Sequence, residues 1–219
     1  MAHMQMADLN ATVRLADLHA YEGVTDLVNG PAMTWAMHAI GHLDADQPAK
    51  AAALFNRSFA ERVHPPFAAW SELPLSVRGG GAVPFLTGSG GFLQAVLYGY
   101  AGVRLRERCM LVRPQLIEGA ASMAIRGVHY QGHALDMVYN AHTLTVALVD
   151  GERSSREPGR GLSISRGSPD CKLSPDSAGT QQLRRAGDRA RFVLLGHAGS
   201  ASLAGSQSWT FVVQVRPGE

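Results

Sequence analysis

The residues best suited to chemistry lie in one stretch, residues 66–103, which reads PFAAWSELPLSVRGGGAVPFLTGSGGFLQAVLYGYAGV. Glu72 stands two residues after Trp70, and a Gly-rich crossing follows at residues 79–81. Sugar-cleaving sites use a carboxylate beside an aromatic wall, where the carboxylate activates a water molecule or attacks the anomeric carbon. An ordinary solvated acid in a loop is the alternative, and these residues alone leave both interpretations open.

The next candidate is the Gly-rich segment at residues 87–91, TGSGG, which we interpret as a turn with Ser89 capping the helix that follows. Free N–H groups at a helix N-terminus favour anions or sugar hydroxyls. The sequence excludes a P-loop, because no Gly-Lys-Ser/Thr follows, and it lacks the third glycine of a dinucleotide fingerprint. A serine-hydrolase elbow at Ser89 is an alternative, although Thr87 replaces its first glycine and Pro84 interrupts the preceding strand.

Histidines offer a third possibility, a metal site. His38 and His42 share a helix face, but Ala39 stands where a zinc-protease helix has glutamate. Three more histidines lie close together further along the chain: His129, His133 and His142. Strand spacing is expected to point these three side chains apart. We therefore predict no metal and no cofactor.

Composition narrows the class of protein. The chain has 219 residues, is 46% hydrophobic and carries a formal net charge of +2. It can bury the core of one large or two small domains, and the charge is too weak to indicate binding to nucleic acid or a membrane surface. Four arginines between residues 104 and 113 are interpreted as a solvated edge rather than a phosphate patch.

Targeting signals and cysteines suggest a compartment. The N-terminus shows no signal peptide, and no apolar run reaches the roughly 18 residues of a transmembrane helix. Cys109 and Cys171 lie far apart without metal-ligand spacing, so we do not expect a disulfide framework. These features predict a cytoplasmic protein.

Helices are predicted in the first half of the chain, and they must position these residues. Apolar residues at steps of three and four predict a buried helix over residues 31–44, after a linker with a helical patch at 11–20. Asp46 is expected to cap a second, antiparallel helix whose first turn holds Pro48 and which Pro65-Pro66 ends. The third helix follows Ser89 and ends near Gly102.

From about residue 104 the pattern changes to strands. A hairpin turn is predicted at residues 130–133, because Gln131-Gly132 separates two alternating segments. Further strands are expected at 110–113, 122–126, 135–139 and 144–148. Residues 151–190 are predicted to be disordered or poorly packed. Residues 191–195 and 209–215 are expected either to pair as two strands or to form a non-native tail.

Three strings carry a family resemblance: YEGVTDLVNGPAMTWAMHAIGHLD, RSFAERVHPPFAAWSE and GAVPFLTGSGGFLQAVLYGYAGVRL. Together they resemble the C-terminal part of glycoside hydrolase family 65, in particular its acid-trehalase-like members. The resemblance is strong over residues 21–105, moderate to residue 149, and fades beyond. It implies the last helices of an (α/α)6 barrel over residues 1–104, a small antiparallel β-sandwich over 105–150, and a low-complexity tail over 151–219.

The resemblance also implies an activity. It indicates inverting hydrolysis of an α-glucoside, such as the glucosyl-galactosyl-hydroxylysine of collagen, with Glu72 as the general base that deprotonates water. Trp70 is expected to form a sugar-facing wall. Further expected contacts with the substrate or the pocket rim are Thr87, Gly88, Ser89, Asp26 and Trp35.

Two departures from the family pattern shape the expectation. No residue of this sequence matches the motif of the general acid, so the chain alone is expected to be inactive. Pro84 stands where the family has asparagine. The alternatives are a non-catalytic truncated isoform or carbohydrate-binding fragment, and a serine hydrolase that uses Ser89.

Overall fold

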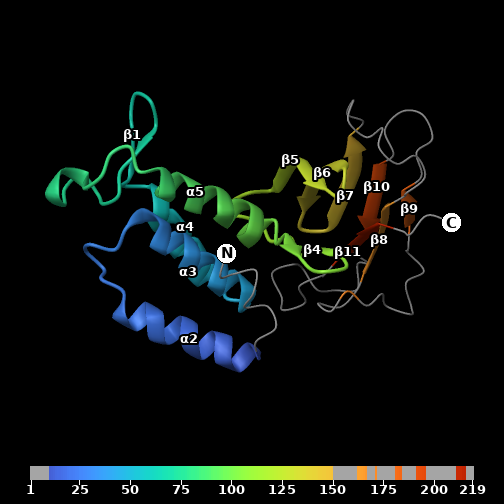
Figure 1. Cartoon of the computed structure of the whole chain (residues 1–219), viewed down its shortest axis with the longest axis horizontal. Coiled ribbons are helices and arrows are strands. Elements are labelled where there is room, and N and C mark those ends of the chain that lie inside the picture. The colour runs from blue at the N-terminus through green and yellow to red at the C-terminus, as the bar shows by residue number, and fades with distance from the viewer. Residues whose placement is uncertain are drawn as a thin grey trace. The chain divides into compact units, whose positions relative to one another are not determined.

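The computed structural model describes residues 10–149, 162–166, 171, 181–183, 191–195 and 211–215. The chain divides into two compact units, residues 1–100 and 101–219. Helices dominate the first unit and antiparallel strands make up the second, as Figure 1 shows. The predicted order, helices followed by antiparallel strands, is confirmed.

The helices of the first unit are α2 (Ala11–Val24), α3 (Ala32–Asp44), α4 (Pro48–Phe59), α5 (Leu86–Gln94) and the π-helical continuation η3 (Ala95–Tyr100). The predicted helix at 31–44 matches α3. The helical patch predicted at 11–20 extends to Val24, and Asn10 caps it by accepting the N–H of Thr12 at 2.8 Å.

Helix α3 is the centre of this unit, and α4, α5 and η3 pack against it. Its buried apolar residues are Ala32, Trp35, Ala36, Ala39, Ile40 and Leu43. Small residues let the partner helix approach closely. A Cβ added at Gly91 lies 3.0 Å from the Cβ of Met33, and one added at Gly99 lies 2.9 Å from a methyl of Leu43.

Aromatic rings fill the space between α4 and α5. Phe55 stacks on Phe92 at 5.1 Å between ring centroids and meets Tyr100 edge-on at 5.0 Å. Phe59 and Trp70 also contact Phe92, at 5.5 and 5.4 Å. Aromatic rings bury large apolar areas, so this cluster contributes strongly to the stability of the unit.

Two helix starts differ from the prediction. Asp46 is not a cap: Gln47 precedes Pro48, while Asp46 has a left-handed φ of 56°. Helix α4 ends at Phe59, before the proline pair. Helix α5 begins at Leu86, so the predicted turn at 87–91 is helical and Ser89 lies inside the helix. Close packing of α5 against α3 outweighs the low helix propensity of these glycines.

A small β-hairpin joins α4 to the rest of the first unit. Strand β1 (Val63–His64) pairs with β2 (Ala69–Trp70), with Val63 opposite Trp70 and His64 opposite Ala69. A short 3₁₀ turn, η2 (Arg78–Gly80), precedes α5. Glu72 lies between the hairpin and this turn in the sequence.

The strands of the second unit are β3 (Arg104–Leu105), β4 (Met110–Val112), β5 (Ser122–Tyr130), β6 (His133–Asn140), β7 (Thr143–Val149), β8 (Leu162–Arg166), β9 (Gln181–Leu183), β10 (Arg191–Leu195) and β11 (Phe211–Val215). They form two antiparallel sheets with the orders β10-β7-β6-β5 and β3-β4-β11-β8-β9. The predicted hairpin is confirmed: Tyr130 pairs with His133, and Gln131 and Gly132 both have positive φ.

Two expectations for residues 151–219 differ from the structure: which strands pair, and how residues 151–190 are ordered. Strand β10 pairs with β7, whereas β11 pairs with β4 and β8, so 191–195 and 209–215 do not pair with each other. Strands β10 and β11 lie where strands were expected, whereas β8 and β9 fall within residues 151–190, where we expected disorder or poor packing. Val212 and Val213 in β11 are fully buried. Pairing between distant strands leaves no local pattern, which is why the sequence did not indicate it.

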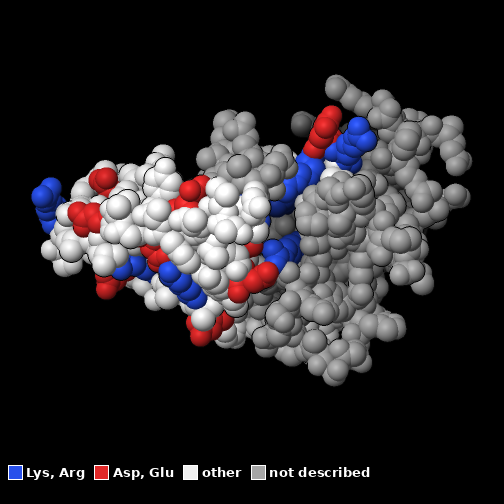
Figure 2. Space-filling view, turned by 90° about the horizontal axis from the view of Figure 1, so that it is seen from below, with Lys and Arg blue, Asp and Glu red and all other residues white. Residues whose placement is uncertain are grey.

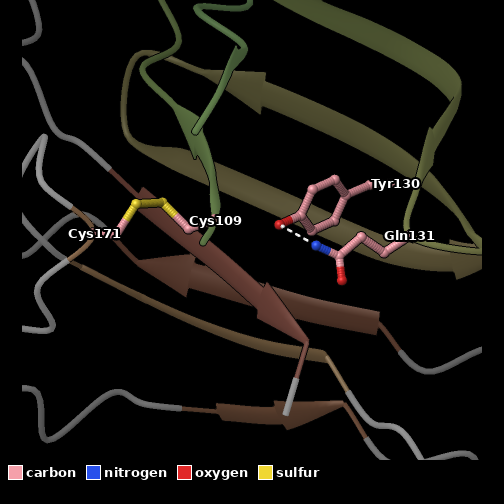
Figure 3. The surroundings of a disulfide bond; sticks show 4 residues. All are labelled: Cys109, Tyr130, Gln131 and Cys171. Atoms are coloured by element: carbon pink, nitrogen blue, oxygen red, sulfur yellow. Dashed lines mark hydrogen bonds between the residues drawn. A yellow bond between two sulfur atoms is a disulfide. The ribbon is translucent and has the colours of Figure 1, made fainter. Parts of the chain in front are cut away.

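The prediction for the cysteines is also wrong. Cys109 and Cys171 form a disulfide, with their Cα atoms 6.0 Å apart (Figure 3). Cys109 is fully buried with Leu111 and Val212, and Cys171 packs against this cluster. Their distance in sequence does not prevent the bond. Cys109 directly precedes β4 and Cys171 follows β8, and β11 pairs with both of these strands.

The charge distribution and the helix lengths bear on the surroundings of the protein. On the face shown in Figure 2, the described acidic and basic side chains are interspersed with uncharged ones. Among the described residues, no helix is both long and apolar enough to cross a lipid bilayer.

Candidate functional site

The segment that carries Glu72 follows β2 and is the middle one of three segments that form a small ribbon. On one side, the N–H of Ser71 donates to the carbonyl of Arg62 at 2.8 Å. On the other side, the N–H of Glu72 donates to the carbonyl of Ala82 at 3.0 Å, and that of Leu73 to Gly80 at 2.9 Å. Main-chain hydrogen bonds on both sides therefore fix the backbone of Glu72.

The Glu72 side chain is half-buried and has a main-chain partner. The side-chain Oε2 accepts a hydrogen bond from the N–H of Ala82 at 3.2 Å. The main-chain carbonyl of Glu72 accepts one at 2.9 Å from the N–H of Ala32, at the start of α3. A Cβ added at Gly81, where φ is +66°, would lie 2.8 Å from Oε2. Only glycine suits this position. One carboxylate oxygen is thus held, and the carboxylate still has capacity to accept a proton from water.

Trp70 lies two residues before Glu72 and packs into the aromatic cluster. Its Nε1 donates to the carbonyl of Ser58 at 3.3 Å, and its ring contacts Phe92. A Cβ added at Gly88 would lie 2.6 Å from Cδ1 of Trp70. The structure therefore brings Trp70 and Gly88 together, with the indole half-buried rather than fully exposed.

Ser89 and Thr87 both lie in α5. The Ser89 hydroxyl donates to the carbonyl of Leu86 at 2.9 Å, within α5. The N–H groups of Gly88 and Ser89 donate to the carbonyl of Phe85, so neither is free to bind an anion. No strand precedes Ser89 directly, since residues 81–85 are irregular, and the nucleophile elbow of a serine hydrolase is not formed. Thr87 is exposed on the first turn.

Asp26 and Trp35 meet at the turn before α3. The exposed Asp26 carboxylate accepts hydrogen bonds from the side-chain amide of Asn29 and from the N–H groups of Asn29 and Val28, which lower its pKa. Trp35 is 1% exposed, and its Nε1 donates to the carbonyl of Gly30 at 3.2 Å. Trp35 therefore lies in the core of the first unit rather than at a surface rim.

Sequence reasoning missed a buried arginine that links this turn to the Glu72 segment. Arg62 is 1% exposed, and burial lowers its pKa. Its guanidinium donates to the carbonyls of Arg57 at 2.5 Å and Gly30 at 3.3 Å, while its own carbonyl accepts from Ser71. Gly30 thus receives hydrogen bonds from both Arg62 and Trp35. No local sequence signal separates such an arginine from a solvated one.

Two more residues escaped prediction. Ser71 is fully buried, and its hydroxyl lies 2.9 Å from Nε2 of His64. Ser71 stands between Trp70 and Glu72, which is the one feature of the sequence that could have drawn attention to it.

Among the described residues, no group of three or more His, Cys, Asp or Glu side chains could hold a metal ion.

Comparisons with known proteins point to one family. The chain is 38% identical over 173 residues to the protein-glucosylgalactosylhydroxylysine glucosidase of Danio rerio, which covers 72% of this chain and 26% of that protein. It is 38% identical over 144 residues to the protein of the same name in Gallus gallus, covering 66% and 20%. An acid trehalase of Emericella nidulans is 33% identical over 142 residues, covering 61% and 13%. No family profile matches the chain.

A comparison with solved structures bears on the fold. A solved structure from the human microbiome, described as a candidate kojibiose phosphorylase, aligns with a TM-score of 0.55 at 11% identity, covering 86% of this chain and 23% of that one. This likeness supports the fold alone. The chain spans about a quarter or less of the length of these curated relatives. The comparisons confirm the resemblance of the sequence motifs: over most of its length this chain is similar to one portion of proteins named protein-glucosylgalactosylhydroxylysine glucosidase, and at lower identity to an acid trehalase.

Proposed function

We propose that this chain is part of an inverting α-glucosidase that removes glucose from glucosyl-galactosyl-hydroxylysine or a related α-glucoside, and that Glu72 is its general base. The main support is the 38% identity to proteins named protein-glucosylgalactosylhydroxylysine glucosidase, over a region that includes most of this chain. The fold likeness to the candidate kojibiose phosphorylase is consistent with helices of an (α/α)6 barrel followed by a β-sandwich. Trp70 and Gly88 then form a packed floor beside the base.

The proposed step follows from the position of the carboxylate. Glu72 accepts a proton from a water molecule whose oxygen attacks the anomeric carbon. The bond from that carbon to the leaving oxygen breaks, and a general acid donates a proton to the leaving oxygen. No residue of this chain matches the motif of that acid. The N–H of Ala82 holds Oε2 of Glu72, which orients the carboxylate without neutralising its charge.

A chimera tests the assignment. The matched portion of the Danio rerio relative is replaced by this chain, and glucose release from glucosyl-galactosyl-hydroxylysine is measured. Glu72→Ala is expected to lower kcat by about 10²–10⁴-fold, which is the usual contribution of a positioned base. Sodium azide should then restore turnover in part and yield β-glucosyl azide, because the small anion attacks from the side that the base serves.

The matched control is Glu61→Gln, an exposed carboxylate in the same unit, which should leave kcat unchanged. The 219-residue chain by itself is expected to release no glucose. Full activity in the Glu72→Ala chimera contradicts the assignment of the base. Glucose release by the isolated chain contradicts the expectation that its general acid lies elsewhere.

A further inference from the structure

We propose that Ser71 and His64 are positioning residues that hold the Glu72 carboxylate in place. This inference rests on the proposed role of Glu72 as general base. It goes further because neither residue belongs to the reacting groups, and both act through the backbone of the segment that carries Glu72.

The two side chains differ in their exposure. Ser71 is fully buried, whereas Glu72 is half-buried. The Ser71 hydroxyl therefore lies inside the unit, while part of the Glu72 side chain is open to solvent.

The Ser71 hydroxyl has three neighbours but only one hydrogen to donate. Its nearest acceptor is the carbonyl of Leu73 at 2.5 Å, while the carbonyl of Arg62 is 3.4 Å away. The hydrogen bond to Leu73 spans the backbone of Glu72 and fixes its bend. With the hydrogen used in this way, Oγ can only accept from Nε2 of His64, at 2.9 Å.

The hairpin places His64 for this task. His64 pairs with Ala69 across β1 and β2, so Ser71, two residues further, is a diagonal neighbour on the same face. The geometry requires a proton on Nε2 of His64. A glutamine at this position can present an N–H donor at a similar distance from the backbone, whereas leucine fills similar space without one.

The first test uses the 219-residue chain and needs no activity. Amide hydrogen exchange is measured at Glu72 and Ala82, whose N–H groups hold the ribbon together. Ser71→Ala and His64→Leu should each lower protection at these amides by about tenfold, the equivalent of one hydrogen bond of about 1.4 kcal/mol. His64→Gln should restore it. Nitrogen-15 NMR of His64 should show the hydrogen on Nε2.

The matched control is Ser58→Ala. Ser58 is also a fully buried serine of this unit, but its hydroxyl donates to the carbonyl of Phe55 within α4. It should leave exchange at Glu72 and Ala82 unchanged. If Ser71→Ala unfolds the chain, the comparison of His64→Leu with His64→Gln still decides. Unchanged protection in His64→Leu, or a hydrogen on Nδ1 alone, overturns the proposal.

The second test connects the pair to catalysis in the chimera. Misplacing a base should lower kcat by up to about a hundredfold while KM changes little. His64→Leu should show this split, and His64→Gln should recover kcat. A chimera that loses activity in Glu72→Ala but keeps full kcat in His64→Leu overturns the positioning role alone. A chimera indifferent to Glu72→Ala overturns the assignment of the base, and the exchange experiment then still decides whether the pair holds the ribbon.

Discussion

The two units hold their important segments in different ways. In the second unit, continuous strand ladders and the disulfide between Cys109 and Cys171 connect segments that are distant in sequence. In the first unit, single main-chain hydrogen bonds hold Glu72 to Ala32 and Ala82, and glycines allow the surrounding elements to approach closely.

This difference indicates which substitutions should destabilise each unit. In a strand ladder each hydrogen bond is one of many, so loss of a single one changes the stability little. The disulfide closes a long loop, and its loss is expected to destabilise the second unit most. A segment held by only a few hydrogen bonds depends on close packing, so one added methyl group can displace it. The first unit should therefore respond to small changes of volume, and the second to loss of the disulfide.

The largest expected effect is in the second unit. Cys171→Ser opens the disulfide while keeping the buried Cys109 in place, and the loop of 62 residues predicts a loss of about 4 kcal/mol in its free energy of unfolding. Urea unfolding followed by hydrogen exchange measures each unit separately. Residues 31–100 should keep their protection. An equal loss in both units would show that the contrast between them is wrong.

The next effect is in the first unit. Gly88→Ala places a methyl group 2.6 Å from Trp70 and 2.9 Å from Ala32, so overpacking should cost about 1–3 kcal/mol. Gly90→Ala is the control on the same helix, because a Cβ there meets nothing within 4 Å. It should stabilise α5 by up to about 1 kcal/mol through helix propensity. If both variants change thermal stability alike, close packing at Gly88 is unimportant.

A smaller effect tests the Glu72 carboxylate directly. Gly79 and Gly81 both have φ of +66°, so alanine at either should cost about 1–2 kcal/mol of backbone strain. Only the Cβ at position 81 meets Oε2 of Glu72; the one at position 79 meets nothing within 4 Å. Gly81→Ala should therefore also lower amide protection at Ala82, and Gly79→Ala should not. Equal protection in the two variants would argue against the close contact.

The smallest effect is a dependence on pH. Burial lowers the pKa of His38, and the nearby carboxylate of Glu22 only partly opposes this. The unfolded chain, with an ordinary histidine pKa of about 6.5, then binds the proton more readily. The first unit should be most stable above that pH and lose stability as the pH falls below it.

Urea midpoints measured between about pH 8 and pH 5 check this dependence, since the window brackets the ordinary histidine pKa. His38→Gln should flatten the profile, while His19→Gln, at an exposed position, should not. A midpoint that rises on acidification in the unaltered chain would contradict the sign.

Much of the candidate site could be predicted, but not how it is held. The neighbouring Trp70 and Glu72 are visible in the sequence, and the role of Glu72 stays a prediction until the chimera is measured. The expected role of the indole as a sugar-facing wall stays a prediction. The structure adds that the half-buried ring packs on Phe92, because burial of a large ring in the aromatic cluster is favourable. Ser71 and Arg62 carry no motif. Their importance comes from burial, which a single sequence does not encode locally.

The sequence by itself determined what depends on period and turn chemistry. It predicted α3 from its apolar steps, the hairpin at Gln131-Gly132 from its positive-φ residues, and the change from helices to strands near residue 104. The tertiary structure alone decided which distant segments meet. It placed Ser89 inside α5, joined Cys109 to Cys171, and put β10 and β11 in different sheets. Alternation and helical period specify the kind of surface a segment offers, but many partners suit the same surface, and only packing of the whole chain selects one.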